Sequence, residues 1–365
     1  MIYKKFFHSI CLTVTCCVTV IMATVFPMSC KMTEHGIDVT NTDTEVPKIE
    51  NFAMQDSSNL VISCSEKIKL EELLIENLQD NQITSVSNVT YNEENKEATI
   101  TLETETTVGD EYTISGKVVD EAGNSPLFSL PFVGYNDNQA HLILSEIRTK
   151  HSTSNNTLKK SEYIEFYVLK SGNTAGLEII TGSDGVDKKY IFPAIEVQQG
   201  EYITVHYRVL SEGACIDELT DDLTLSTAES SSNKARDLWI NNVETRISDS
   251  DVIVLKDSIK NTIMDSILYS MSNKKDWYTN EQKSLASDCY ENGNWSGGCS
   301  VNEAACSDNI TAIRTLSRLN IKDIVATLSV NESIENEIIL ANKNDWAVVK
   351  LGTPGEENSL EKYVK

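Results

Sequence analysis

Basic residues are scarce in this chain of 365 residues. It has 31 Lys and Arg against 55 Asp and Glu, for a formal net charge of −24 at pH 7. All the acids follow residue 30, so loss of a leader containing Lys4 and Lys5 leaves 29 basic residues against 55 acids, a charge of −26. Such a charge repels phosphate backbones and anionic lipid headgroups, and it argues against a basic face for nucleic acid.

The sequence also lacks the local motifs of common enzyme classes. It contains no Gly-x-Ser-x-Gly elbow, P-loop, dinucleotide-binding glycine fingerprint or His-Glu-x-x-His pair. His206 is in a predicted strand with polar neighbours, but it has no adjacent Cys or second His at the spacing of a metal site. We therefore expect His206 at the surface, no cofactor and no catalysis.

The N-terminal segment is typical of an export signal. Two lysines precede residues 10–26, which carry no charge; this run is short for a membrane span of about 20 apolar residues, and Pro27 follows it. Ser29 directly before Cys30 resembles a lipoprotein cleavage site, at which residues 1–29 are removed and Cys30 is acylated. Ordinary secretion with Cys30 as a spare thiol is the alternative.

Residues 30–45 predict a flexible tether, because they are rich in Thr, Asp, Glu and Asn and have little to bury. Acyl chains on Cys30 would hold the protein at the membrane, since each buried methylene contributes about 0.8 kcal/mol. Lys31 directly after the cysteine resembles the Gram-negative sorting pattern that favours the outer membrane. The face of that membrane stays open.

Alternation of apolar and polar residues predicts an all-β protein. Helical spacing is present only over residues 69–78 and 320–329. About 320 residues follow the tether, more than one core usually holds, so we predict two Ig-like antiparallel β-sandwiches in tandem. The predicted strands cover residues 59–66, 96–104, 111–120, 161–169, 201–209 and 250–257.

The first predicted sandwich spans residues 46–136, close to the roughly 100 residues of an immunoglobulin-like domain. In "YTISGKVVDEAGNSPLFSLPFVGY" a strand ends at Asp120, and Gly123 and Asn124 suit the turn that follows. This turn and the earlier "NLVISCSEKI" resemble the bacterial Ig-like domains of S-layer and other cell-surface proteins. The resemblance implies a spacer or adhesion module without catalysis; a generic β-hairpin turn is the alternative.

The second predicted sandwich spans residues 139–358, and a tail follows at 359–365. Its segments arrive in the order "SEYIEFYVLKSG", "GLEIITGSDG", "YIFPAIEVQQGEYITVHY", "DSDVIVLKDSIKNTIMDSILYS" and "DWAVVKLGTPGEEN". This order resembles a lamin-tail domain, an Ig-like β-sandwich of nuclear lamins and of many bacterial secreted and lipid-anchored proteins. Ser145 replaces the usual Asn, "GLEIIT" lacks a Trp, and the extra length implies insertions at about 208–236 and 272–310. The positions that match are Glu146, Glu162, Glu165, Phe192-Pro193, Gly200, Asp265 and Thr353-Pro354-Gly355.

Three glutamates of this region could form a site. Glu146, Glu162 and Glu165 could converge as paired carboxylates for acid/base catalysis or as oxygen ligands for Ca²⁺. The alternation of their strands favours solvated faces and sheet edges instead. We therefore predict no catalytic residue and no metal, with Glu146 and Glu165 as the remaining metal candidates.

Five cysteines remain beyond Cys30, namely Cys64, Cys215 and three in "CYENGNWSGGCSVNEAAC". Their odd number leaves at least one thiol free or paired between chains. Cys289, Cys299 and Cys306 are candidates for a disulfide, which would stabilise the fold by roughly 2 to 4 kcal/mol, but the sequence does not say which pair forms. Their spacing does not match structural zinc patterns.

The same insertion carries four aromatic residues, Trp277, Tyr278, Tyr290 and Trp295. Rings on a Gly- and Asn-rich extracellular loop can stack on sugars or anchor a protein partner. They can equally fill the underside of their own loop. We predict that these four residues form a recognition loop.

These observations together predict a non-catalytic, lipid-anchored protein of the bacterial cell envelope. Its role would be adhesion, scaffolding or binding of a protein or glycan partner through loops of the C-terminal sandwich. The alternative is a secreted hydrolase of the phosphoesterase or nuclease kind, or an accessory module of one, because lamin-tail-like domains also accompany such enzymes.

Overall fold

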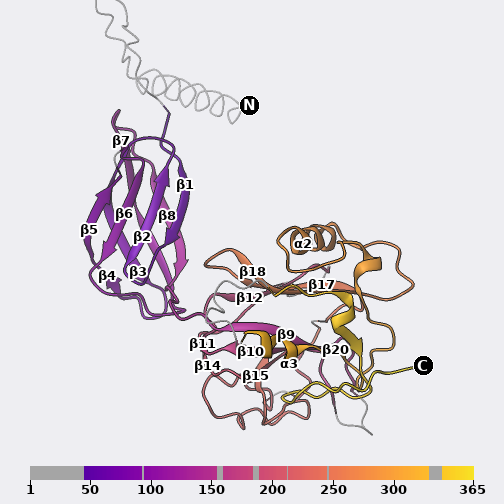
Figure 1. Ribbon diagram of the computed structural model, residues 1–365. Helices are drawn as coiled ribbons and strands as arrows, with labels where there is room; N and C mark the ends of the chain where they lie inside the picture. The colour runs from indigo at the N-terminus through magenta and orange to yellow at the C-terminus, as the bar shows by residue number, and fades with distance from the viewer. Residues whose placement is uncertain are drawn as a thin grey trace, which may run out of the picture. The chain divides into compact units, whose positions relative to one another are not determined.

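The computed structural model describes residues 45–92, 94–153, 159–183, 189–211, 213–244, 246–328 and 339–365. The predicted signal peptide, Cys30 and nearly all of the tether therefore lie outside the described residues. The described part is all-β with a few short helices, as the alternation of the sequence predicts (Figure 1). None of its helices is long and apolar enough to cross a membrane.

The first sandwich consists of two four-stranded antiparallel sheets around a core that contains Leu60, Ile62, Ile100 and Ile114. One sheet has the order β1 (Ile49–Met54), β2 (Asn59–Cys64), β6 (Glu97–Leu102), β5 (Val86–Tyr91). The other has the order β4 (Ile83–Thr84), β3 (Ile68–Asn77), β7 (Glu111–Asp120), β8 (Leu127–Val133).

The helix predicted over residues 69–78 is wrong, because this segment is strand β3. Between Glu71 and Leu74 the register of β3 against β7 shifts, and Glu72 has a φ of 54°. Such a β-bulge puts two residues opposite one and breaks the period of two. Gly116 lies at this point of β7, where a Cβ would be 2.9 Å from Leu73. The bulge makes the apolar spacing of a strand look helical.

The second sandwich stacks a six-stranded sheet on a five-stranded one. The first has the order β16 (Arg236–Trp239), β15 (Tyr202–His206), β10 (Tyr163–Lys170), β9 (His141–Arg148), β20 (Leu316–Arg318), β21 (Trp346–Val348). The second has the order β13 (Lys189–Ile191), β12 (Leu177–Thr181), β17 (Asp251–Asp257), β18 (Thr262–Ser270), β19 (Ala305–Cys306). Strands β11 (Gly172–Asn173) and β14 (Glu196–Val197) form a separate pair. The β15–β16 and β18–β19 pairs are parallel, and the others are antiparallel.

Two α-helices and two 3₁₀ turns accompany this sandwich. Helix α2 (Asn280–Glu291) lies over β17 and β18 (Figure 1). Helix α3 (Ile321–Leu328) confirms the helix predicted near residue 320, and its Leu328 packs against Ile143 and Leu169. The turns η1 (Val301–Glu303) and η2 (Lys343–Asp345) precede β19 and β21.

The six-stranded sheet is covered on both of its faces at β9, where all eight residues are buried. Leu142, Leu144 and Phe166 belong to the core between the sheets, whereas Ile143 belongs to the cluster with α3. A strand covered on both sides has no solvated face, even where its sequence alternates. For this reason most polar residues on β9, β10 and β15 are enclosed in the protein and do not face solvent.

Candidate functional site

The glutamates expected on a solvated face are buried, and that expectation is wrong. Glu146 on β9 is paired directly with Glu165 on β10, and neither side chain has any exposed surface. Glu162, just before β10, is also buried, and its carboxylate pairs with the Arg208 guanidinium at 2.8 Å and with His151 at 3.2 Å. The strands are central rather than at an edge, so these acids must be satisfied inside the protein.

Hydroxyl and backbone donors satisfy Glu146. The Tyr163 hydroxyl donates to Oε2 at 2.5 Å, and the Ser317 hydroxyl donates to Oε1 at 2.8 Å. The backbone N–H of Thr353 donates to Oε2 at 3.0 Å. The Glu146 carboxylate therefore links three segments that are far apart in the sequence.

Glu165 holds the same C-terminal segment. Its Oε2 accepts from the backbone N–H of Gly355 at 2.7 Å, and its Oε1 accepts from the Ser145 hydroxyl at 3.1 Å. Burial first, and the neighbouring charge of Glu146 second, raise the pKa of Glu165 well above its usual value. The pair fastens residues 353–355 over the sheet and has no surface for a substrate.

His206, expected at the surface, is also fully buried, which corrects that expectation. Its Nε2 lies 2.7 Å from Asp237 Oδ1, and its ring stacks on Trp239 at 3.9 Å between centroids and 11° between planes. Among the described residues no three His, Cys, Asp or Glu side chains come together as a metal site would need. His206 is a packed core residue of the edge formed by β15 and β16.

The four aromatic residues predicted as a recognition loop divide into two pairs. Trp277 and Trp295 are buried in the core, where their ring N–H groups donate to the backbone oxygens of Cys299 at 2.7 Å and Glu303 at 3.1 Å. The rings of Tyr278 and Tyr290 are 87% and 50% exposed. Only the two tyrosines can therefore meet a partner over a large area.

The cysteines of this segment are thiols in the structure. Cys289, a residue of α2, is buried in the core, while Cys299 and Cys306 are exposed. Burial raises the pKa of the Cys289 thiol to about 12, which keeps it unreactive. Any disulfide in this segment that leaves the core intact would join Cys299 to Cys306.

A cavity of about 580 Å³ opens beside the exposed tyrosine. We call it the Tyr278 cleft. The segments that line it follow β9 and β12, precede β10 and β17, and connect β18 to α2, and Gln282 of α2 also lines it. Trp277 contributes a fixed wall and Tyr278 a free ring, and hydroxyls of Ser183, Ser248 and Ser250 are also present. A volume of this size suits a small molecule or one end of a larger chain.

The start of α2 fixes this wall. Thr279 and Gln282 form a capping box, in which the Thr279 Oγ1 accepts from the Gln282 N–H at 3.0 Å. The Gln282 side chain also accepts from the Tyr278 N–H at 2.9 Å and donates to Asp251 Oδ1 at 3.1 Å. Gly182 permits this approach, because a Cβ there would lie 2.8 Å from Gln282. The backbone of Tyr278 is thus anchored while its ring is exposed.

Two acidic side chains of the Tyr278 cleft accept hydrogen bonds from neighbouring residues. Asp249 accepts from Lys150 and from Thr149, and Asp276 accepts from Lys283 Nζ at 2.9 Å. This bond is the main reason that the pKa of Asp276 is lowered. In contrast, neither Arg246 nor Lys274 pairs with an acid of the described chain. The cleft therefore has two cationic side chains that lack an ion pair within the described residues, beside an exposed ring.

Sequence reasoning did not find the site as a whole. It identified Trp277 and Tyr278, but it did not identify Arg246, Lys274 or helix α2. "TNEQ" at 279–282 is a capping-box pattern that could have predicted the start of α2. Arg246 carries no local signal, because only the fold brings it to the cleft.

Comparisons with known sequences concern the second sandwich. The sequence family TP_1001_2nd, described as "protein second domain", matches residues 140–348. An uncharacterized protein of Treponema pallidum (strain Nichols) is 33% identical over 163 residues, which are 44% of this chain and 40% of that protein. The match thus spans less than half of that relative's length.

Solved structures give only distant likenesses. The N-terminal part of the bacterial S-layer protein SbsC is 17% identical, with a TM-score of 0.25 over 40% of this chain and 37% of that one. A DUF4876 family protein from Bacteroides thetaiotaomicron VPI-5482 is 11% identical, with a TM-score of 0.27 over 69% of this chain and 83% of that one. Scores this low support no argument about function.

Proposed function

The chain belongs to the TP_1001_2nd family through its second sandwich, and from this premise we propose a non-catalytic, lipid-anchored envelope protein that binds an acidic glycan in the Tyr278 cleft. The observation that carries this proposal is the exposed Tyr278 ring beside Arg246 and Lys274, which form no ion pair with an acid in the described part of the chain. An aromatic ring stacks on the apolar face of a sugar, and Arg and Lys pair with its carboxylate or sulfate groups.

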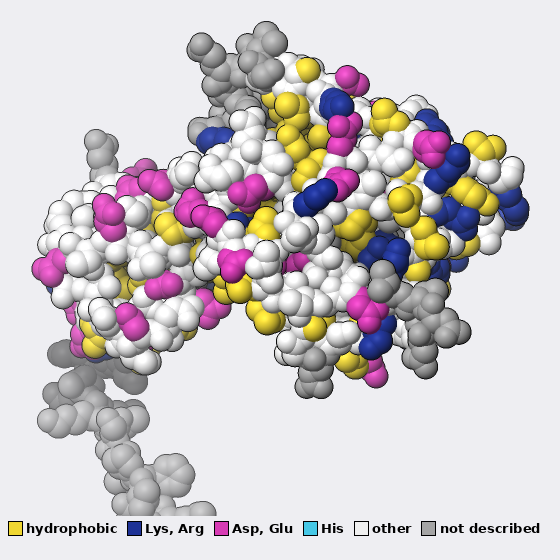
Figure 2. All heavy atoms as spheres, turned by 90° about the horizontal axis from the view of Figure 1, so that it is seen from below, with side chains coloured by type: hydrophobic (Ala, Val, Ile, Leu, Met, Phe, Trp, Pro, Cys, Tyr) yellow, Lys and Arg dark blue, Asp and Glu magenta, His cyan; other side chains and the backbone are white. Residues whose placement is uncertain are grey.

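The distribution of charge supports the second sandwich as the binding part. Both sandwiches are net acidic, but basic residues are scarcer in the first: residues 46–136 contain five Lys and Arg against 16 Asp and Glu, and residues 139–358 contain 21 against 33. On the face in Figure 2 the basic side chains gather on the second sandwich, while the first shows mostly acidic ones. An acidic ligand would be repelled by the first sandwich, which we propose to be a spacer.

We also propose that the second sandwich is of lamin-tail type. Support comes from the positions that carry the resemblance, since Thr353 and Gly355 donate their backbone N–H groups to Glu146 and Glu165. Asp265, another of these positions, is buried and pairs with Arg318 at 2.7 Å. Residues matched one by one in the sequence thus contact one another in space.

The test is a binding measurement on the full-length chain with tetragalacturonate as the acidic probe and cellotetraose as the neutral one. We expect tetragalacturonate to bind at low ionic strength and cellotetraose to bind more weakly. Tyr278→Ala should weaken binding about tenfold, since loss of one stacked ring removes roughly 1–2 kcal/mol. Tyr290→Ala is the matched control, because it removes another exposed ring of the same segment outside the cleft.

Equal loss in both tyrosine variants, or no binding of either oligosaccharide, would exclude the glycan site. Lipid anchoring is tested separately by incorporation of labelled palmitate. We expect label in the wild-type chain and none in Cys30→Ser. Label absent from both chains would leave ordinary secretion as the correct interpretation of the N-terminal segment.

A further inference from the structure

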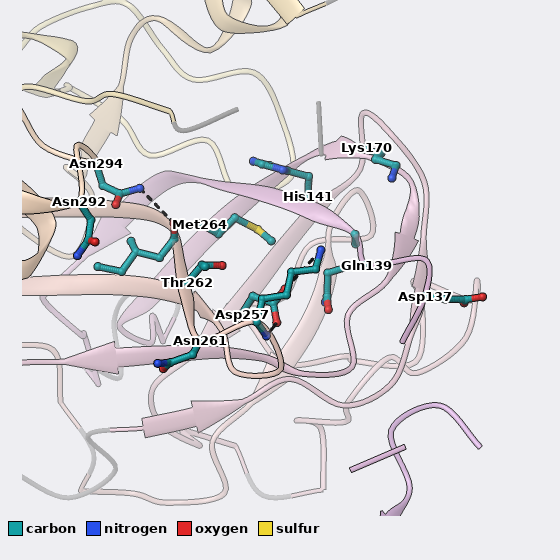
Figure 3. A pocket seen from close by; sticks show the side chains of 13 residues that line it. Asp137, Gln139, His141, Lys170, Asp257, Asn261, Thr262, Met264, Asn292 and Asn294 are labelled. Carbon is teal, nitrogen blue, oxygen red and sulfur yellow. Dashed lines mark hydrogen bonds and ion pairs between the residues drawn. The ribbon is translucent and has the colours of Figure 1, made fainter. Parts of the chain in front are cut away.

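A second cavity, of about 410 Å³, shares no lining residue with the Tyr278 cleft. We call it the His141 cleft. In Figure 3, His141 and Lys170 form one wall, the turn from Asp257 to Thr262 forms the opposite wall, and Asn292 and Asn294 close a third side. These groups come from the start of β9, the end of β10, the β17–β18 turn and the chain after α2.

His141 lines this cavity and carries a buried polar atom without a partner in the described chain. Its side chain is only 8% exposed, and its buried Nε2 has no hydrogen-bond partner among the described residues. A buried polar atom without a partner costs roughly 1–3 kcal/mol, so such atoms are rare in proteins unless water or a ligand satisfies them. The position of His141 in a cavity wall makes a ligand possible.

The local field around His141 is positive. Burial first, and then the charges of Lys170 and Lys260, lower the pKa of His141 to about 4. Asp257, an acid of the same cleft, accepts at Oδ1 from the N–H groups of Ile259 at 2.9 Å and Lys260 at 3.0 Å. The Lys260 ammonium lies 4.0 Å from the other oxygen, Oδ2. Asp137, the second acid of the cleft, is exposed.

The remaining lining suits hydroxyl groups. Asn292 donates its side-chain N–H to Asp288 O at 2.8 Å, and Asn294 donates to Ile263 O at 3.2 Å. Both amides therefore keep their side-chain oxygen as an acceptor, which is the group that a sugar or polyol hydroxyl needs. The volume lies within the range of about 300 to 1,000 Å³ found for small-molecule sites.

From this geometry we propose that the His141 cleft binds a small hydroxylated anion, whose carboxylate or phosphate group accepts from His141 Nε2 and pairs with Lys170 and Lys260. Binding adds a negative charge beside the imidazole, so it favours the protonated ring and raises the pKa of His141. Affinity therefore increases as pH falls from 6.5 towards 4, because the bound state takes up a proton that the free state does not hold.

The test is calorimetric titration of the full-length chain with glucose 6-phosphate, glucuronate and glucose at low ionic strength. We expect saturable binding of one or both anions and none of glucose. Binding of only one anion identifies phosphate or carboxylate as the recognised group. Lys260→Met should weaken binding at least tenfold, whereas Lys322→Met, which removes an exposed lysine on α3, should change it less than twofold.

A second measurement does not depend on any variant. The pKa of His141, followed by NMR of its ring, should rise by about one unit when the cleft is saturated with the anion that binds. Tyr278→Ala should leave this binding unchanged, which separates the two clefts. The proposal would be overturned if neither anion bound, or if glucose bound equally well. It would also be overturned if the pKa of His141 did not change when the ligand bound.

Discussion

Single charged residues inside the second sandwich connect its layers. Arg318 on β20 and Asp265 on β18 are both fully buried and are 2.7 Å apart, and Asp265 also accepts from the Leu144 N–H at 2.7 Å. Because β20 and β18 belong to different sheets, this ion pair crosses the core. A charge in such a place is tolerated only while its partner is present.

Loss of one partner should therefore be costly. We expect Arg318→Met to lower the free energy of unfolding by about 3–5 kcal/mol, because Asp265 is left buried without its cation. Urea unfolding measures this change. Lys322→Met, which breaks the exposed pair with Glu357, should cost less than about 1 kcal/mol. A similarly small loss of unfolding free energy in both variants would show that the buried Arg318–Asp265 pair stabilises the fold no more than an exposed pair does.

The raised pKa of Glu165 predicts how the stability of the protein changes with pH. Its pKa is raised in the folded protein, so above pH 4.5 the folded chain keeps a proton that the unfolded chain has lost. The free energy of unfolding contributed by this group is then highest at low pH and falls as pH rises through that window. Glu165→Gln keeps the group neutral, so its stability relative to wild type should increase from pH 4.5 to pH 8.

Urea unfolding of both chains at pH 4.5, 6 and 8 checks this difference. Glu121→Gln is the control, because that side chain is 79% exposed. Its stability relative to wild type should stay constant over the same range. A constant difference for Glu165→Gln as well would mean that Glu165 is ionised in the folded protein.

At the scale of elements, α2 determines whether the Tyr278 cleft has a fixed wall. Thr279 caps this helix and also donates from Oγ1 to Gly182 O at 2.6 Å. We expect Thr279→Val, which keeps the shape and removes the hydroxyl, to lower stability by about 1–2 kcal/mol and to weaken oligosaccharide binding. Ser284→Ala changes an exposed serine of the same helix and should do neither. Unfolding in urea and the tetragalacturonate titration give the two readouts.

The strands of this protein could largely be predicted, because alternation depends on local sequence. Residues 111–120 and 250–257 became β7 and β17 with nearly the predicted bounds. The failures have physical causes. A bulge at Glu72 gave β3 an apparent helical period, and α2 has few apolar residues, with only Gln282, Ala286 and Cys289 buried.

The candidate sites could be predicted less well than the strands. Alternation of apolar and polar residues on β9 and β10 indicates that the two faces of these strands differ in polarity. It does not reveal that α3 and residues 353–355 cover the more polar face. Glu146, Glu165 and His206 were therefore expected in water. Likewise, His141 and Lys260 are over 100 residues apart in sequence, and only the stacking of the two sheets brings them to one cavity.

For the whole molecule, the main feature is the presence of two separate hydrophobic cores. One contains Ile100 and the other contains Phe166, and both side chains are fully buried. No buried residue is shared between these two clusters within the described chain. Proteins with several cores often do not unfold in a single step, so each sandwich should have a thermal transition of its own.

Core truncations should therefore act on one transition at a time. Ile100→Ala should lower the midpoint of the first sandwich by roughly 10 °C or more, because a cavity there costs about 2–5 kcal/mol in a small domain. Phe166→Ala should lower only the other midpoint, since it removes about 3–5 kcal/mol from the larger core. Differential scanning calorimetry of the three chains resolves the transitions. A single transition that both substitutions shift equally would show that the two sandwiches unfold as one cooperative unit.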